Sequence, residues 1–111
     1  MANSLTISGV VVTAPYIFST KSGGKVLSFR VKNETIKGRL REVVYIQVNV
    51  YNEGQRERLL SRNLQTGDRV WVLGEIMARY ENDGKDVLEV RGNQVDPVVK
   101  IQTVEVDDDG V

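Results

Sequence analysis

The strand pattern of residues 43–51 places two aromatic rings and two amides on one side of the chain. Tyr45 and Tyr51 alternate there with Gln47 and Asn49, while the opposite side is apolar. An aromatic ring offers a flat π surface for stacking, and an amide offers both donors and acceptors of hydrogen bonds. This side therefore suits a ligand with flat, polar-edged rings. The alternative is a polar strand surface that contacts another subunit.

Two further aromatic side chains, Trp71 and Tyr80, belong to a long strand pattern that follows the turn signal at residues 66–68. Gly74 interrupts this pattern and predicts a bulge, a sharp bend or a close backbone approach. Small closed barrels need such a bend where one strand serves both halves of the sheet. The Trp71 side chain could alternatively pack beneath a helix or in a subunit interface.

Basic side chains concentrate in the first 41 residues, which contain Glu34 as their only acid. The chain has fifteen basic and fifteen acidic side chains, but four of the acids lie in residues 105–111. Residues 1–104 therefore carry fifteen basic and eleven acidic side chains, a net charge of +4. This asymmetry predicts a polyanion-binding body with an acidic terminus; a solvated surface with a solubilising tail explains it equally well. The candidate phosphate-binding side chains are Arg30, Lys32, Arg39, Arg41 and Arg79.

The composition argues against most catalytic chemistry. The chain contains no Cys and no His, so it has no disulfides, no thiolate zinc ligands and no histidine general base. We therefore expect neither an enzyme nor a bound metal or cofactor. No run of about 18 apolar residues and no charged-then-apolar start is present, so we expect no membrane segment and no signal peptide.

Hydrophobic alternation predicts five strands, at residues 5–12, 25–32, 43–51, 70–80 and 86–95. On the second strand Phe29 shares the inward side with Leu27 and Val31. The side chains expected to point outward from it are Val26, Ser28, Arg30 and Lys32. Tyr16 and Phe18, in a segment that pairs briefly, fit either a β-ribbon contact or local packing.

The remaining segments complete a single domain, predicted at residues 1–104, with a short acidic tail at 105–111. The polar, basic segment 33–42 predicts a flexible loop, and 98–106 predicts a last edge strand or an extended arm. The helical window is 55–64, with a buried stripe of Leu59, Leu60 and Leu64. Five strands with one short helix between the third and fourth indicate an all-β, Greek-key OB-fold barrel. An SH3-like barrel is the structural rival, but that fold does not expect a helix at this point.

Four segments of the chain form an ordered series of motifs. They are Asn3-Ser4-Leu5-Thr6-Ile7-Ser8-Gly9 with Pro15, the stretch from Ser22 to Val31, the pattern Leu-x-x-Gly-Asp-x-Val-x-Val-x-Gly at 64–74, and Glu89-Val90 with Gln94-Val95. In this order and at this spacing they resemble the bacterial and phage single-stranded DNA-binding proteins, over about residues 3–100. That family's long linker and Pro-Phe tip have no counterpart here, which fits a compact phage or plasmid member.

The resemblance implies an OB-fold protein that binds single-stranded DNA whatever its sequence and protects it during replication, recombination and repair. It implies a homo-oligomer, a tetramer or a dimer, for which Val10 and Val12 are the candidate contact. It implies a cytoplasmic location, either nucleoid-associated or phage-encoded in the host. The acidic tail is expected to dock replication or repair proteins, to compete with DNA, or to remain solvated.

The same resemblance assigns roles to the candidate side chains. Rings would stack on bases, cations would bind phosphates and amides would bond base edges. The predicted nucleic-acid-binding residues are Tyr45, Tyr51, Trp71, Tyr80, Arg30, Lys32, Arg39, Arg41, Arg79, Gln47 and Asn49. Two alternatives stay open: a primosomal-type accessory OB protein that mainly assembles replication partners, and an RNA-binding OB module. Stacking and phosphate contacts scarcely separate DNA from RNA.

Overall fold

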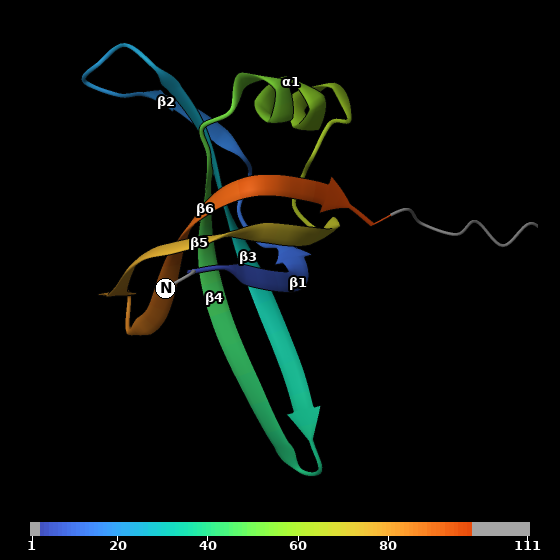
Figure 1. The fold of residues 1–111 in the computed structure, drawn as a ribbon. Coiled ribbons are helices and arrows are strands. Elements are labelled where there is room, and N and C mark those ends of the chain that lie inside the picture. The colour runs from blue at the N-terminus through green and yellow to red at the C-terminus, as the bar shows by residue number, and fades with distance from the viewer. Residues whose placement is uncertain (1–2, 99–111) are drawn as a thin grey trace, which may run out of the picture.

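The structure, a computed structural model, describes residues 3–98. The edge strand or extended arm predicted at 98–106, beyond Val98 itself, and the acidic tail predicted at 105–111 lie outside the described residues. The elements of Figure 1 are β1 (Leu5–Val11), β2 (Tyr16–Ser19), β3 (Lys25–Lys37), β4 (Leu40–Val50), α1 (Glu53–Ser61), β5 (Arg69–Asn82) and β6 (Lys85–Pro97).

Five of these strands close into a barrel. Neighbours in the order β1-β5-β6-β4-β3 are hydrogen-bonded, and β3 pairs back with β1 to complete the ring. β4 and β6 run parallel, whereas the other neighbours in the ring are antiparallel. The predicted all-β, five-stranded OB barrel with one helix between its third and fourth strands is confirmed. The brief pairing predicted at residues 16–19 is also present, because β2 adds a further strand along β3.

β5 bends where it passes from one half of the barrel to the other. Its first part pairs with β1 as well as β6, and the β5–β6 register shifts between Leu73 and Gly74. A Cβ atom at Gly74 would overlap the carbonyl oxygen of Arg91 on β6. The bulge and the close backbone approach predicted at Gly74 are therefore confirmed, because no side chain fits between the two backbones.

One side of each barrel strand fills the interior, as the alternation predicts. The core cluster consists of Val11, Leu27, Phe29, Val31, Ile46, Val48, Val50, Leu59, Leu64, Val70, Val72, Val90 and Val95. Val26 and Ser28 lie on the outer side of β3, as predicted, but neighbouring groups bury both side chains there. Val26 lies between β2 and Tyr51, and Ser28 is hydrogen-bonded within the sheet.

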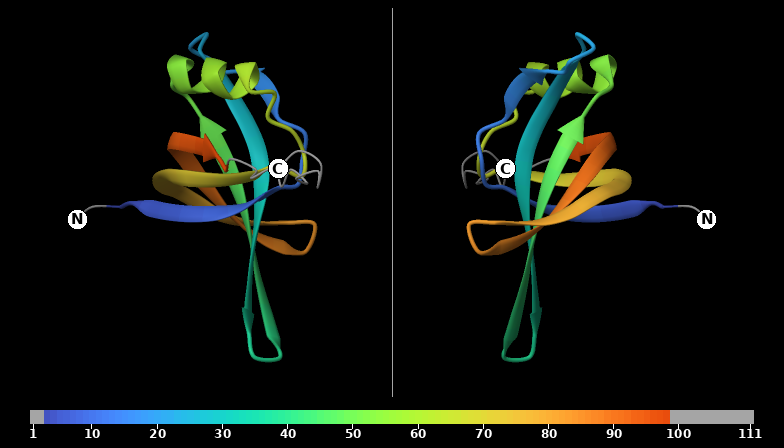
Figure 2. Two further views of the ribbon diagram at one scale, coloured as in Figure 1. Left: turned by 90° about the vertical axis from the view of Figure 1, so that its right-hand side faces the viewer. Right: turned by 90° about the vertical axis from the view of Figure 1, so that its left-hand side faces the viewer.

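α1 covers one end of the barrel, and the β3–β4 hairpin projects from the other end (Figure 2). Leu59 is fully buried against the core, and Leu64 is almost as well buried. Leu60 is 48% exposed, so its place in the predicted buried stripe is wrong. Consecutive helical residues point about 100° apart, and Leu59 takes the inward direction. Within residues 3–98, α1 is neither long nor apolar enough to cross a membrane.

Two capping residues set the bounds of α1, which starts and ends before the predicted 55–64. The side-chain oxygen of Asn52 accepts a hydrogen bond from the backbone N–H of Gln55, which caps the first turn. Asn63 has a φ of +54°, the left-handed conformation that commonly ends helices. The predicted bounds, which followed the leucine spacing, missed both caps.

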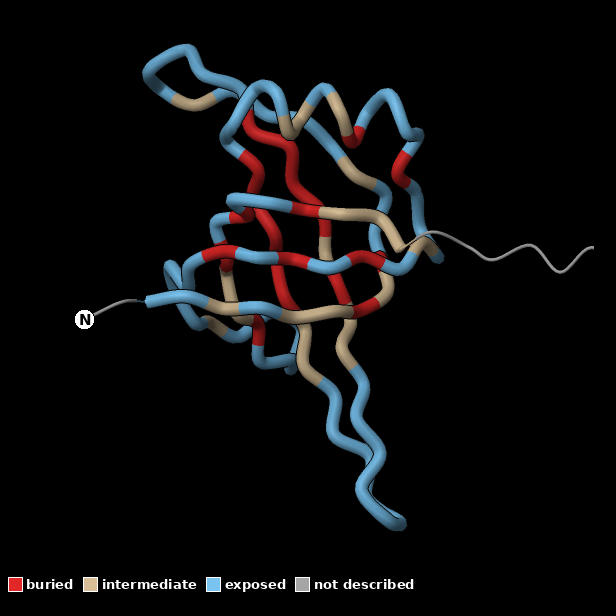
Figure 3. Tube along the Cα trace, turned by 45° about the vertical axis from the view of Figure 1, so that its right-hand side comes forward, coloured by how far each residue is buried: buried red, intermediate tan, exposed pale blue. Residues whose placement is uncertain are grey.

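The prediction of a flexible loop at residues 33–42 is wrong. β3 and β4 stay paired as far as Lys37 and Leu40, and their two-residue turn has Gly38 at a φ of +61°. One of the favoured two-residue hairpin turns, type II′, requires glycine at its first position. We call residues 33–44 the arm; Figure 3 shows it as an exposed extension of two strands whose barrel portions are buried.

The arm pairs despite its many charges, because four of them form two cross-strand ion pairs. The Arg41 guanidinium lies 2.7 Å from a Glu34 carboxylate oxygen across the two strands. Lys37 and Glu42 form a second cross-strand pair at 3.5 Å. Opposite charges at neighbouring positions of an antiparallel ladder are stabilising. The high charge density that predicted a loop therefore supports a hairpin instead.

Candidate nucleic-acid interface

The outer side of the sheet brings Tyr45 and Tyr80 together. Tyr45 on β4 is the ladder partner of Val87 on β6, and Val87 is the ladder partner of Tyr80 on β5. Adjacent strands lie about 4.8 Å apart, so the two tyrosines are about 10 Å apart on one side of the sheet. The Lys85 ammonium lies 4.8 Å from the centre of the Tyr45 ring.

Tyr51 directly follows β4 and carries a second cation on its ring. The guanidinium carbon of Arg91 lies 5.1 Å from the Tyr51 ring centre. Arg91 is the ladder partner of Asn49, so it shares the outer side with Tyr45. We call the group of Tyr45, Tyr51, Tyr80, Lys85 and Arg91 the tyrosine face.

Lys85 and Arg91 are functional candidates that the sequence prediction missed. They stand on one side of β6, at alternate positions that also include Val87 and Glu89. Because this alternation is visible in the sequence, it could have identified Lys85 and Arg91 as residues of one strand side. The placement over Tyr45 and Tyr51 depends on the parallel β4–β6 ladder, whose partners are about forty residues apart in the chain.

Gln47 and Asn49 lie on the predicted outer side, but their amides form hydrogen bonds with other side chains of the protein. The Gln47 oxygen accepts from the Arg30 Nε (3.0 Å), and its nitrogen donates to the Ser28 hydroxyl (2.6 Å). That hydroxyl donates to the Asn49 oxygen (2.8 Å), and the Asn49 nitrogen donates to Glu89 (2.7 Å). Gln47 is 9% exposed and Asn49 4%, so this polar network ties β3, β4 and β6 together beneath the tyrosine face.

The predicted cations of β3 and the arm extend this side of the sheet. Lys32 is the ladder partner of Tyr45 and also lies 3.6 Å from Glu34. Arg41 pairs with the same glutamate, and Arg39 stands in the turn at the end of the arm. Lys32 and Arg41 are therefore partly neutralised by Glu34.

Trp71 and Arg79 do not join the tyrosine face. Trp71 is 53% exposed beside Ser8 of β1, so the alternative place beneath the helix is wrong. Arg79 is the ladder partner of Leu88 and points to the opposite side of β5 from Tyr80. The register shifts in β5 between Leu73 and Ala78 change which residues share a side.

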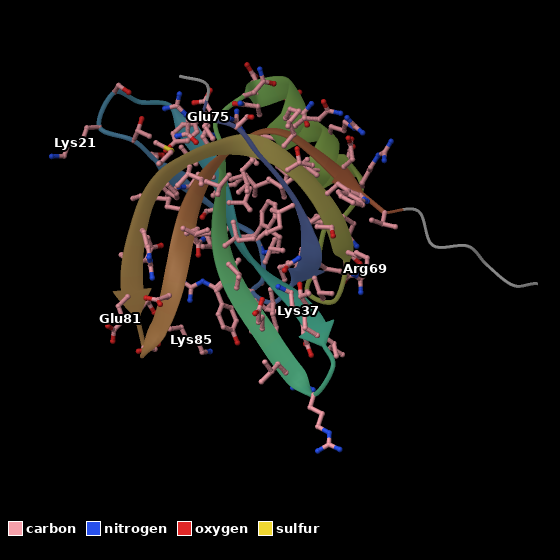
Figure 4. The ribbon with its side chains drawn as sticks, turned by 60° about the horizontal axis from the view of Figure 1, so that its bottom comes forward. Lys21, Lys37, Arg69, Glu75, Glu81 and Lys85 are labelled. Atoms are coloured by element: carbon pink, nitrogen blue, oxygen red, sulfur yellow. The ribbon has the colours of Figure 1, made fainter. Side chains whose placement is uncertain are left out.

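Two hairpins project from the barrel near Tyr45. Figure 4 shows the arm, marked by Lys37, and the β5–β6 hairpin, marked by Glu81 and Lys85, as separate extensions of the barrel. A groove lies between them and is lined by Val43, Val44, Arg79, Asp86, Val87 and Leu88. Val44, the neighbour of Tyr45 in β4, and Val87, its ladder partner, both line this groove.

The geometry defines the class of the protein: an OB-fold barrel whose outer sheet carries aromatic rings with cations beside them. The single-strand binding protein family matches residues 2–100, so the chain belongs to this family. Its members are not enzymes, as the composition predicts. No curated protein sequence matches the chain significantly. Within residues 3–98, no acidic cluster that could hold a metal ion is found.

Solved structures show the same fold at low sequence identity. A Plasmodium falciparum SSB in complex with ssDNA has a TM-score of 0.65 and 19% identity, covering 88% of this chain and 94% of that one. The wild-type single-stranded DNA binding protein from Thermus aquaticus has a TM-score of 0.66 and 22% identity, covering 88% of this chain. A deletion mutant of the Thermus aquaticus protein has a TM-score of 0.65 and 20% identity. This chain spans about half the length of the two Thermus chains.

Proposed function

We propose that this protein binds single-stranded DNA along the tyrosine face, with little preference for base sequence. The observation that carries the proposal is the pairing of rings with cations, Lys85 at Tyr45 and Arg91 at Tyr51, on the outer sheet of an OB barrel. Unpaired bases expose flat rings that stack on tyrosine, and their phosphates bind neighbouring cations. Family membership supports the same conclusion.

Each group in the site has a distinct role. The rings of Tyr45, Tyr51 and Tyr80 stack bases, each for roughly 1–3 kcal/mol. The phosphate-binding cations are Lys32, Arg39, Arg41, Lys85 and Arg91. Gln47 and Asn49 act indirectly, because their hydrogen bonds hold the three strands at fixed positions. The proposed site does not include Trp71 and Arg79, which lie off the tyrosine face.

We further propose that the bound strand is an intermediate of replication, recombination or repair, and that copies of the chain associate. Val12, Trp71 and Leu73 are exposed apolar side chains on or beside the β1–β5 side of the barrel. Burying such side chains between copies is favourable, and this location keeps the tyrosine face free. Light scattering at micromolar concentration tests this, and a monomeric mass would contradict it.

The binding proposal is tested by the fluorescence anisotropy of labelled oligo(dT) at two salt concentrations, with a duplex of equal length as control. Tyr45→Ala, Tyr51→Ala and Tyr80→Ala should each weaken single-strand binding by roughly 1–3 kcal/mol for any base sequence. Tyr45→Phe keeps the ring and is the matched control. Normal binding by all three alanine variants, with binding lost in an Arg39→Ala, Arg41→Ala double variant, would indicate a general polyanion binder and favour the accessory-protein alternative.

A further inference from the structure

β2 presents two aromatic rings that the proposed site does not use. Tyr16 is 52% exposed and Phe18 39% exposed, on a strand that lies outside the closed ring of the barrel. Their ring centres are 6.1 Å apart and the ring planes are inclined by 36°. The two side chains therefore form one exposed aromatic surface rather than part of the core.

This surface lies on the same side of the sheet as the tyrosine face. Tyr16 is the ladder partner of Ser28, Ser28 of Asn49, and Asn49 of Arg91. A row of side chains on one side of the sheet thus runs from β2 across β3 and β4 to the cation that lies over Tyr51. The aromatic pair on β2 continues the tyrosine face across two strands, a distance of about 10 Å.

A groove joins Tyr51 to the β2–β3 hairpin. It is lined by Thr20, Ser22, Gly24, Lys25, Val26, Tyr51, Glu53 and Arg56. Val26, which lines this groove, is the ladder partner of Phe18 on β2. The Arg56 guanidinium donates to the backbone oxygen of Lys25 (2.9 Å), which holds a cation at the groove. Lys21 extends outward from the hairpin turn (Figure 4).

We propose that Tyr16 and Phe18 form an additional stacking subsite for the single strand that passes Tyr51, with Lys25 and Arg56 near its phosphates. This inference rests on the proposed function and lengthens the site. The ligand is a base of the same strand, because the subsite continues the tyrosine face and combines aromatic rings with cations. With one base stacked on each ring, the subsite accommodates about two nucleotides.

The exposed edge of β2 suggests a competing explanation. An apolar edge strand is a ready template for pairing with a second copy of the chain. Ile17 is 45% exposed and belongs to the same edge, but it points to the opposite side from Tyr16 and Phe18. A stacking subsite requires the two aromatic residues and not Ile17, whereas edge pairing would involve the whole strand.

The test uses the full chain with a Tyr16→Ala, Phe18→Ala double variant and a series of oligo(dT) from 4 to about 16 nucleotides, the range reported for one OB fold. We expect short oligonucleotides to bind within about twofold of wild type, because the tyrosine face suffices for them. Long oligonucleotides should bind about 5-fold or more weakly. The length at which affinity stops rising should fall by about two nucleotides.

Control variants and measurements separate the outcomes. Ile17→Ala should bind every length as wild type does, and circular dichroism checks that each variant is folded. If the double variant binds long oligonucleotides normally while Tyr51→Ala binds them weakly, the subsite is wrong and the proposed function stands. If Tyr45→Ala, Tyr51→Ala and Tyr80→Ala all bind normally too, the proposed function fails as well. A changed oligomeric mass with unchanged DNA affinity would show that β2 is a contact between copies and overturn the inference.

Discussion

The ammonium of Lys85 lies 4.8 Å from the centre of the Tyr45 ring, although the two residues stand on different strands and are forty positions apart. Lys85 begins β6 and Tyr45 lies within β4, and the parallel ladder between these strands brings them together. A cation over a ring face is attracted by the quadrupole of the ring. The contact therefore holds a positive charge beside an aromatic ring within the proposed binding site.

The first prediction concerns the two cations of the tyrosine face. Lys85→Gln and Arg91→Gln should each make the salt slope of binding less steep by up to about 0.7, the contribution of one phosphate contact on a single strand. The matched control is Arg69→Gln, because Arg69 pairs with Val10 of β1, away from the tyrosine face. Anisotropy titrations between about 50 and 200 mM salt measure the slope. Equal slopes for all three variants would contradict the assignment.

The second prediction concerns Glu34, which pairs with both Lys32 and Arg41. Glu34→Gln should tighten single-strand binding at low salt and steepen the salt slope by up to about 1.4, because two cations become available to phosphates. Glu42→Gln makes the same change in net charge on the arm but releases only Lys37. A difference between the two variants therefore measures the released pair, and identical slopes would indicate a general charge effect.

The third prediction concerns the bend in β5. Gly74→Ala should lower the free energy of unfolding by about 3 kcal/mol or more, because the added Cβ would overlap the Arg91 carbonyl oxygen. Gly23→Ala is the control, since that residue has a φ of +87° but open space around it. Its cost should be about 1–2 kcal/mol. Urea unfolding compares the two, and equal costs would count against the close approach at Gly74.

The fourth prediction concerns the polar network. Ser28→Ala removes the hydroxyl that donates to Asn49 and accepts from Gln47, leaving two buried amide groups without that partner. The expected loss in free energy of unfolding is about 1–3 kcal/mol. Ser22→Ala removes an exposed hydroxyl that contacts only Thr20 and should cost less than about 0.5 kcal/mol. Similar urea midpoints for the two variants would refute the role of the network.

The fifth prediction concerns pH. The side-chain hydrogen bond from Gln94 lowers the pKa of Asp96 from its ordinary value of 3.8, and Arg58 lowers it further, while partial burial opposes both. A lowered pKa in the folded state stabilises the protein above the unfolded pKa, and this stability is lost as pH falls below 3.8 through the folded pKa. The carboxylate is 38% exposed, so solvent screening limits the effect to under about 1 kcal/mol.

Asp96→Asn should therefore reduce stability at pH 7 and flatten its decline between about pH 5 and pH 2. Thermal unfolding across this range provides the measurement. Asp86→Asn, which removes an exposed partner of Arg79, controls for the loss of one negative charge. Parallel pH profiles for wild type and Asp96→Asn would show that the Asp96 contacts contribute nothing.

Local sequence determined the parts of this protein that depend on neighbouring residues. The alternation around Phe29 and Ile46 assigned the core sides of two strands, because successive residues of a strand point to opposite faces. Gly74 marked the bend, since a residue without a side chain permits a close backbone approach. Tyr45 and Tyr51 shared the predicted side for the same reason of alternation. The motifs at 3–31 and 64–74 indicated the family that the comparison confirms.

Tertiary structure decided what depends on residues far apart in the chain. Lys85 reaches Tyr45 only through the β4–β6 ladder, and the buried amide of Gln47 finds its hydrogen-bond partners, Arg30 and Ser28, on β3. The charges of the arm favour a hairpin because Glu34 and Arg41 face each other across two strands. Strand pairing and burial are interactions between distant segments, so local spacing cannot specify which charge meets which ring.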